Sequence, residues 1–296
     1  MRLLTIGTIL VATDLTDTSA GAVATGVRLA EAVGATLHVA HVATEEDERS
    51  VTPDRRAEYE REIEAALAPA TSTTQPHAHL LFGEPPDALA SVADELHADV
   101  VVLGRRDGRR KPAPDRPVGS MAYACVTRTF VPVLVIAEAL SIPLRKTLVA
   151  VDASDAARGS LLMALSWASA LRDKSATDAS LTVYHVDTGA DASAEKTRLR
   201  RSALHDADVL ERNAPGWAQV AVERITVKHA DPAAAISRYA VDSGAELVVL
   251  GTRSSADHGQ SVWGSVSASI TRQLSSPILL VPPAVWRDHV RDIDPF

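Results

Sequence analysis

Two loops in the sequence carry residue types that suit phosphate binding. In the later loop, the run from Gly251 to Ser254 follows a short apolar stretch, and nine residues separate Ser254 from Gly264-Ser265. Glycine after a strand lets the backbone approach a phosphate or a ribose closely. Gly264-Ser265 opens a helical pattern, and the free N–H groups and positive dipole end of a helix start favour an anion. The Ser265 hydroxyl can donate to a phosphate oxygen or can simply cap the helix.

The earlier loop runs from Gly104 to Gly119-Ser120 and is two residues longer than the interval from Gly251 to Gly264. Asp107 lies within it and would repel a phosphate group. The loop is also basic, so it is either a phosphate clamp or a solvated basic loop, and Asp107 favours the second interpretation. Its basic residues are Arg105, Arg106, Arg109, Arg110, Lys111 and Arg116.

The two loops recur because the chain repeats itself. Four blocks, at residues 9–14, 37–42, 98–104 and 132–136, match blocks at 147–152, 181–186, 245–251 and 277–281 in the same order. Chance similarity rarely preserves order over so many blocks. The sequence therefore predicts a tandem duplication, with domains at residues 1–140 and 145–283.

Each copy alternates short apolar blocks with Ala-rich amphipathic segments. The apolar blocks are rich in β-branched residues, which is typical of strands that are buried on both faces of a parallel sheet. Helices are expected at Ser19 to Val33, Pro85 to Leu96, Asp155 to Leu171 and Pro232 to Ser243. This alternation predicts an α/β fold of two doubly wound, five-stranded parallel-sheet domains.

In an open parallel sheet, ligands bind beyond the carboxyl ends of the strands. Asp14 and Asp152 follow the first strand of the two copies, and Val42 and Val186 follow the second. These residues are therefore binding-site candidates together with the glycine loops. The alternative for the two Asp residues is a capping role in the turn between strand and helix.

These motifs resemble those of the ATP-binding universal stress proteins. That family carries an Asp at the end of the first strand and, after the fourth, Gly-x-x-Gly, nine residues and Gly-Ser or Gly-Thr. The resemblance covers about Thr8 to Ile136 and about Arg145 to Pro282. The second copy keeps the spacing but has Ser254 at the second glycine, whereas the first copy has Asp107 there and a longer loop.

The resemblance implies an adenine-nucleotide site in each copy, with the second copy the better one. ATP, with or without Mg²⁺, is the expected ligand. Asp152 and the backbone at Val186 would contact adenosine, and Gly251 would lie against the ribose. The phosphates would be surrounded by Ser254, Gly264, Ser265 and Val266. The counterparts in the first copy are Asp14, Val42, Gly104, Gly119 and Ser120.

The resemblance also implies that the two copies pack as a pseudo-dimer. We expect the last strands, Val133 to Ile136 and Ile278 to Val281, to meet near its axis, because apolar edge strands need cover. A homodimer of the whole chain is a further possibility.

Composition narrows the class of protein. The net charge is -8 and aromatic residues make up 4% of the chain. Neither value suits nucleic-acid binding, which uses positive charge and stacking rings. No apolar run is long enough to span a membrane, and no signal peptide is predicted at the start of the sequence, so a cytoplasmic protein is expected. Cys125, the single cysteine, is expected to be a buried, inert thiol.

Several other residues are weaker functional candidates. His41 and His185 end equivalent strands and are expected to be packed strand residues. His77 and His79 alternate on one predicted strand, but no third ligand at metal spacing is evident from the sequence. Trp263, directly before Gly264, would either cover the nucleotide, seal the junction between copies or simply pack.

The sequence leaves three functional hypotheses. The first is a regulator that binds ATP with very slow or no hydrolysis, because no Walker-type Lys and no general base are evident. The second is a nucleotide-free scaffold for a protein partner, which Asp107 and Ser254 favour. The third is an adenosine-nucleotide-using enzyme, which lacks support because no Ser-Gly-Gly-x-Asp-Ser loop follows the first strand.

Overall fold

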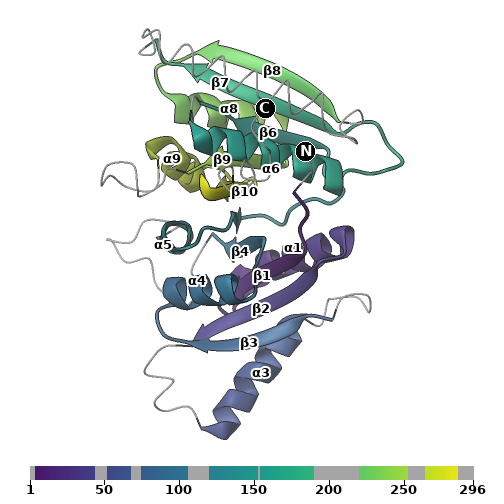
Figure 1. The fold of residues 1–296 in the computed structure, drawn as a ribbon, viewed down its shortest axis with the longest axis vertical. Helices are drawn as coiled ribbons and strands as arrows, with labels where there is room; N and C mark the ends of the chain where they lie inside the picture. The colour runs from purple at the N-terminus through teal and green to yellow at the C-terminus, as the bar shows by residue number, and fades with distance from the viewer. Residues whose placement is uncertain are drawn as a thin grey trace, which may run out of the picture. The chain divides into compact units, whose positions relative to one another are not determined.

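The computed structural model describes residues 4–43, 52–67, 75–105, 120–152, 154–189, 220–252 and 264–285. The chain divides into two compact units, coloured purple to blue and teal to yellow in Figure 1. The N-terminal unit is Ile6–Leu140, and the C-terminal unit is Ser141–Phe296 together with Met1–Thr5. The expected domains, residues 1–140 and 145–283, differ from these units in that the C-terminal unit also includes the first five residues and residues 141–144 and 284–296.

The N-terminal unit is a parallel sheet with the strand order β3-β2-β1-β4-β5. Helices connect the strands, and α1 packs on β1 and β4 while α4 packs on α5. The strands are β1 (Thr8–Thr13), β2 (Thr36–Ala43), β3 (His77–Phe82), β4 (Val100–Gly104) and β5 (Val133–Ile136). The helices are α1 (Asp17–Val33), α3 (Pro53–Leu67), α4 (Pro85–Glu95) and α5 (Ser120–Arg128).

The C-terminal unit repeats this plan with the order β8-β7-β6-β9-β10, again with parallel pairs. The five strands expected in each copy are confirmed. The strands are β6 (Lys146–Ala150), β7 (Ser180–Asp187), β8 (Ala221–Lys228), β9 (Leu247–Gly251) and β10 (Ile278–Val281). The helices are α6 (Asp155–Leu171), α8 (Pro232–Ser243) and α9 (Ser265–Gln273).

Local sequence explains where these elements begin and end. The helices α1 and α8 both end at a glycine in the left-handed conformation, Gly34 with φ 72° and Gly244 with φ 67°. Only glycine adopts this conformation without strain, so it is the residue of choice for a helix stop. Pro232 fits the first turn of α8, and the Asp231 side chain caps the helix by accepting from the Ala234 N–H at 3.1 Å.

The strand order places the candidate site. In each unit the chain winds outward from the first strand on one side, through β2 and β3 or through β7 and β8. It then crosses to the other side, to β4 or β9. The boundary between β1 and β4, and between β6 and β9, is therefore the topological switch point at which such sheets bind ligands.

Two further expectations concern membrane-spanning helices and the packing of the two copies. Among the described residues, no helix is long and apolar enough to cross a membrane. The pseudo-dimeric packing of the two copies stays a prediction.

Candidate functional site

Gly251 ends β9 in direct contact with the first turn of α6. A Cβ atom added to Gly251 would lie 2.9 Å from both the carbonyl carbon and the Cβ of Ala156. Real Cβ atoms do not approach backbone so closely, so this position needs glycine. The requirement is one of packing: glycine lets β9 lie close to α6 at the switch point of the C-terminal unit.

The two described ends of the later glycine loop lie together. The Ser267 hydroxyl, in the first turn of α9, donates to the carbonyl of Gly251 at 2.8 Å. The next residue along the chain, Thr252, is held by its N–H, which donates to the Val281 carbonyl of β10 at 2.9 Å. The loop therefore leaves β9 and returns to α9 at one place on the carboxyl edge of the sheet.

Gly264 is the N-cap of α9, with φ −60° and ψ 144°, and its carbonyl accepts from the Ala268 N–H at 3.0 Å. A glycine cap has no side chain with which to occupy the N–H groups of the first turn. Helix geometry leaves those of Ser265, Val266 and Ser267 without a partner inside the helix. Ser265 is exposed and Val266 is half-buried, so these donors lie at an accessible helix start that suits an anion.

The aspartates that follow the first strands shape the turn into the next helix. The Asp152 carboxylate accepts from both the N–H and the hydroxyl of Ser154. The Ser154 hydroxyl oxygen in turn accepts from the Ala157 N–H at 3.2 Å, which caps α6. The capping role considered for Asp152 is therefore present, and its exposed side chain also lies at the carboxyl edge of the sheet.

Asp14 repeats this arrangement in the N-terminal unit. Its Oδ1 accepts from the Thr16 N–H at 3.1 Å and from the Thr16 hydroxyl at 2.6 Å. Between them, Leu15 takes a φ of 58°, a conformation that costs a non-glycine residue about 1–2 kcal/mol. The Leu15 N–H donates to the Thr13 hydroxyl at 3.1 Å. Side-chain hydrogen bonds thus hold a strained turn at the switch point.

A buried histidine supports each of these turns. His41 is 3% exposed, and its Nδ1 lies 2.9 Å from the carbonyl oxygen of Thr13, directly before Asp14. His185 is 5% exposed, and its Nδ1 lies 2.9 Å from the carbonyl of Val151, directly before Asp152. Because a carbonyl only accepts, Nδ1 carries the proton in both rings. Both histidines are packed strand residues, as expected, and they also fix the strand end that carries the aspartate.

The valines of the second strands lie within the strands rather than after them. Val42 pairs with Leu81 of β3 and is half-buried, while Val186 pairs with Val227 of β8 and is buried. Each strand continues for one more residue. Their backbone groups at this edge still lie beside the strand ends that carry Asp14 and Asp152.

The N-terminal unit has part of the geometry seen at the ends of the later glycine loop. Gly104 ends β4, and the following N–H, that of Arg105, donates to the Ile136 carbonyl at 2.8 Å, just as Thr252 does to Val281. Ser120 begins α5, as Ser265 begins α9. Ser254, Gly119, Asp107 and Trp263 lie outside the described residues, so the predictions for them stay predictions.

The thiol of Cys125 is fully buried, and burial raises its pKa to about 12. It is therefore protonated at neutral pH, in agreement with the expected inert thiol.

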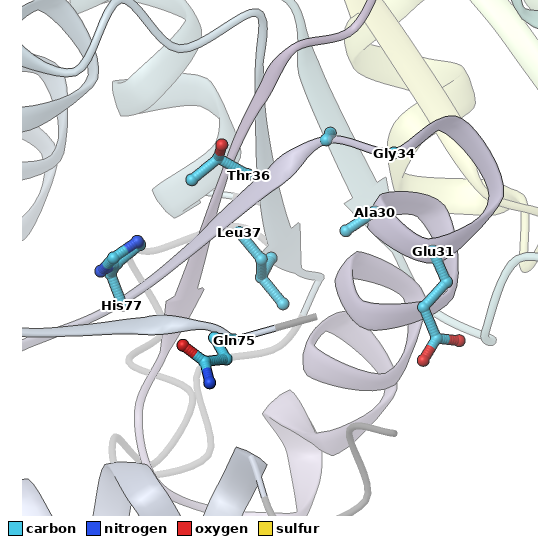
Figure 2. A pocket seen from close by; sticks show the side chains of 8 residues that line it. Ala30, Glu31, Gly34, Thr36, Leu37, Gln75 and His77 are labelled. Carbon is cyan, nitrogen blue, oxygen red and sulfur yellow. The ribbon is translucent and has the colours of Figure 1, made fainter. Parts of the chain in front are cut away.

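A hollow of about 380 Å³ lies in the N-terminal unit, at the end of the sheet opposite to the carboxyl edge (Figure 2). It is lined by the start of β2 at Thr36 and Leu37, by the start of β3 at His77, and by the end of α1 around Glu31 and Gly34. These are the amino ends of the strands, so the hollow is separate from the carboxyl edge where the candidate nucleotide residues gather.

The sequence pattern alone did not identify His38 as a neighbour of the His77 and His79 pair. His38 of β2 lies directly opposite His77, and its Nδ1 is 2.8 Å from Nε2 of His79. The signal was the alternation of His38 with apolar residues in the second strand, but only the strand register brings it to the pair.

Comparison with known proteins identifies the family. A model described as the universal stress protein family matches residues 5–137 and again residues 143–282. The chain belongs to the universal stress protein family. The double match confirms the tandem arrangement expected from the repeat. No curated protein matches the chain.

Solved structures share the fold over nearly the whole chain. A universal stress protein from Archaeoglobus fulgidus is 17% identical, with a TM-score of 0.64 over 94% of this chain and 97% of that one. A putative universal stress protein from Pseudomonas aeruginosa is 16% identical, with a TM-score of 0.57 over 97% of both chains. A universal stress protein in complex with cAMP matches 45% of this chain and 98% of its own, at 27% identity and a TM-score of 0.38.

Proposed function

We propose that this universal stress protein is a regulator that binds an adenine nucleotide, with ATP bound in the C-terminal unit. One observation carries the proposal. The Ser267–Gly251 hydrogen bond brings the end of β9 and the open start of α9 together at the switch point. The loop that joins them has the spacing of the family's phosphate loop.

Each candidate residue has a place in such a site. The N–H groups of Ser265 and Val266 would donate to phosphate oxygens, and Gly251, at the end of β9, would lie against the ribose. Asp152, at the neighbouring strand end, would accept from ribose or adenine. The backbone at Val186 lies on the next strand and would face the base. Ser254 would add a donor from the loop.

The proposed action is binding rather than turnover. At the switch point between β6 and β9, the described candidate side chains are Asp152, buried His185 and Ser265, and none is a Lys that could neutralise a leaving phosphate. Lys228 also lies at this edge, but it ends β8, two strands away from β6. The protonated Nδ1 of His185 donates a hydrogen bond to the Val151 carbonyl. We expect ATP hydrolysis well below about 1 s⁻¹, the lower end of ordinary enzyme rates, and a multiple-turnover assay measures this. A cytoplasmic location likewise stays a prediction.

The competing function is a nucleotide-free scaffold for a protein partner. Ser254 and Asp107 favour it because both replace a glycine of the family's loop. In that case the ordered turns at Asp14 and Asp152 would serve the fold alone.

The deciding experiment measures nucleotide directly. Tag-free protein is denatured and the supernatant is separated by chromatography, and nucleotide-free protein is then titrated with ATP and, separately, with cAMP by calorimetry. The proposal predicts adenine nucleotide in the supernatant or saturable heat of binding with ATP. Protein that carries no nucleotide and binds neither ligand would overturn the proposal and favour the scaffold hypothesis.

A further inference from the structure

Three histidines cluster on one face of the N-terminal sheet. His38 of β2 pairs with His77 of β3, and His79 is two residues further along the same strand, so all three side chains leave the same face. The His38 ring lies 4.9 Å from the His77 ring and 5.1 Å from the His79 ring. His77 is exposed, and His38 and His79 are half-buried, so solvent reaches the cluster.

We propose that His38, His77 and His79 form a binding site for a divalent transition metal ion such as Zn²⁺, Cu²⁺ or Ni²⁺. Imidazole nitrogen is the side-chain donor that these ions share. The site is independent of the proposed nucleotide site. His38 is four residues before Val42 on β2, or about 13 Å away at the usual rise of a strand.

The distance between His38 and His79 carries the proposal. Their facing nitrogens are 2.8 Å apart and share one proton in a hydrogen bond. Two imidazole nitrogens that bind one tetrahedral Zn²⁺ at 2.0–2.1 Å are about 3.3 Å apart. An opening of about 0.5 Å therefore replaces the shared proton with a metal ion, and side-chain torsions supply such a shift.

His77 is the third ligand after a rotation of its ring. It now lies nearly parallel to His38, at 24°, and a stacked ring directs its nitrogens away from the point between the other two. Consistent with this, no group of three His, Cys, Asp or Glu side chains in the described part of the chain could hold a metal ion as the side chains now lie. His77 borders the open hollow of Figure 2, which gives its ring room to turn and gives water access to complete the coordination.

Proton balance is satisfied without a co-reactant. Burial and the neighbouring histidines lower the pKa of His38, and burial and His77 lower the pKa of His79, which favours the neutral form of the two facing rings. The ring that donates in the pair moves its proton to its other nitrogen through solvent. Both facing nitrogens then present a lone pair to the metal, and no net proton is released.

The C-terminal unit supplies a comparison within the same chain. Its register places Thr182 opposite Glu223 and Tyr184 opposite Ile225, where the N-terminal unit has His38 opposite His77 and Ala40 opposite His79. This face of the second sheet therefore lacks the three imidazoles, and we expect a single metal site in the chain.

Metal titration of the tag-free full chain tests the proposal. Calorimetry with Zn²⁺, and electron paramagnetic resonance with Cu²⁺, are run on the original chain, His38→Gln, His79→Gln and His77→Gln. His97→Gln is the matched control, because His97 is also exposed but lies after α4, outside the cluster. Thermal unfolding of each variant shows whether it is folded.

The proposal predicts one metal ion per chain and nitrogen ligation of Cu²⁺. His38→Gln and His79→Gln are each expected to weaken binding by at least about tenfold, since even outer-shell partners cost that much. His77→Gln should weaken binding less, and His97→Gln should leave it unchanged. Absence of binding by the original chain, or folded His38→Gln and His79→Gln variants that bind as tightly as the original chain, would overturn the proposal.

Discussion

The two units share the structure around their first strand and differ where a ligand would meet them. In both, a buried histidine binds the carbonyl before an aspartate, and that aspartate binds a hydroxyl residue two positions later. In both, the residue after the glycine of the fourth strand donates to the last strand. These contacts hold the switch point in shape in either copy.

The differences lie in the glycine loops and on the outer strands. The first loop is two residues longer and carries Asp107, whereas the second keeps the family's spacing. The outer strand β3 carries two histidines, and β8 carries none at the matching positions. Duplication thus preserved the contacts that fold the sheet edge, while the residues that face a ligand diverged. Hydrogen bonds shared at the sheet edge therefore do not by themselves show that a binding site is shared.

The largest expected effect on stability comes from Gly251→Ala in the C-terminal unit. The new Cβ would lie 2.9 Å from the backbone of Ala156, and backbone cannot move aside cheaply. Forced packing of this kind costs about 1–3 kcal/mol of unfolding free energy. Chemical denaturation measures the loss.

Gly21→Ala in α1 is the control change in the N-terminal unit, at a glycine with room for a Cβ atom. There the nearest atom to a new Cβ is 3.7 Å away, an ordinary contact. This substitution should instead stabilise the helix by about 0.5–1 kcal/mol. If Gly251→Ala is as harmless as Gly21→Ala, close packing of β9 on α6 does not explain the glycine.

The next largest effect on stability is expected at His41 and His185, the buried histidines found in both units. His185→Phe and His41→Phe keep a ring but remove the N–H that the Val151 and Thr13 carbonyls accept. A buried acceptor left without its donor costs about 1–3 kcal/mol, so both variants should lose stability to a similar extent. Parallel denaturation curves measure this, and a loss in one variant alone would show that the two edges are not equivalent.

A smaller effect on stability should come from His38 and His79 of the N-terminal unit at low pH. The pKa values of His38 and His79 lie below the ordinary 6.5, so below that pH the unfolded chain binds more protons than the folded chain. Their contribution to stability is present above pH 6.5 and is lost as the pH falls from 6.5 toward the lowered values. The double variant His38→Gln, His79→Gln should therefore lose less melting temperature than the original chain between about pH 7.5 and about pH 5.5. An equal loss in both proteins would contradict this account.

Much of the fold could be predicted because its signals are local. Apolar blocks rich in β-branched residues predicted the strands, and Ala-rich amphipathic segments predicted the helices. The observed α6 begins and ends where the sequence pattern placed it, at Asp155 and Leu171. The repeat then gave the second domain from the first.

The rest depended on contacts between distant segments. No local pattern shows that Ala156 packs against Gly251, or that His38 lies opposite His77, because strand register and helix position decide both. The carboxyl edge was predicted as the site from topology, but the hydrogen bonds of Asp14 and Asp152 required coordinates.

The central claim is that the C-terminal unit holds the better nucleotide site, and Gly264→Asp tests it most directly. Gly264 caps α9 in an extended conformation that any residue adopts, and Asp is a good cap, so the variant should fold. Its carboxylate would meet the phosphates with a repulsion of a few kcal/mol, about 100-fold or more in affinity. Gly264→Asn is the neutral control and should bind more tightly than Gly264→Asp.

The measurement is a calorimetric ATP titration of Gly264→Asp beside Gly119→Asp, the equivalent change in the first loop. We predict that Gly264→Asp removes most of the binding and that Gly119→Asp changes it little. If Gly119→Asp removes the tight site and Gly264→Asp does not, the Arg-rich first loop is the phosphate clamp and the ranking of the two units is wrong.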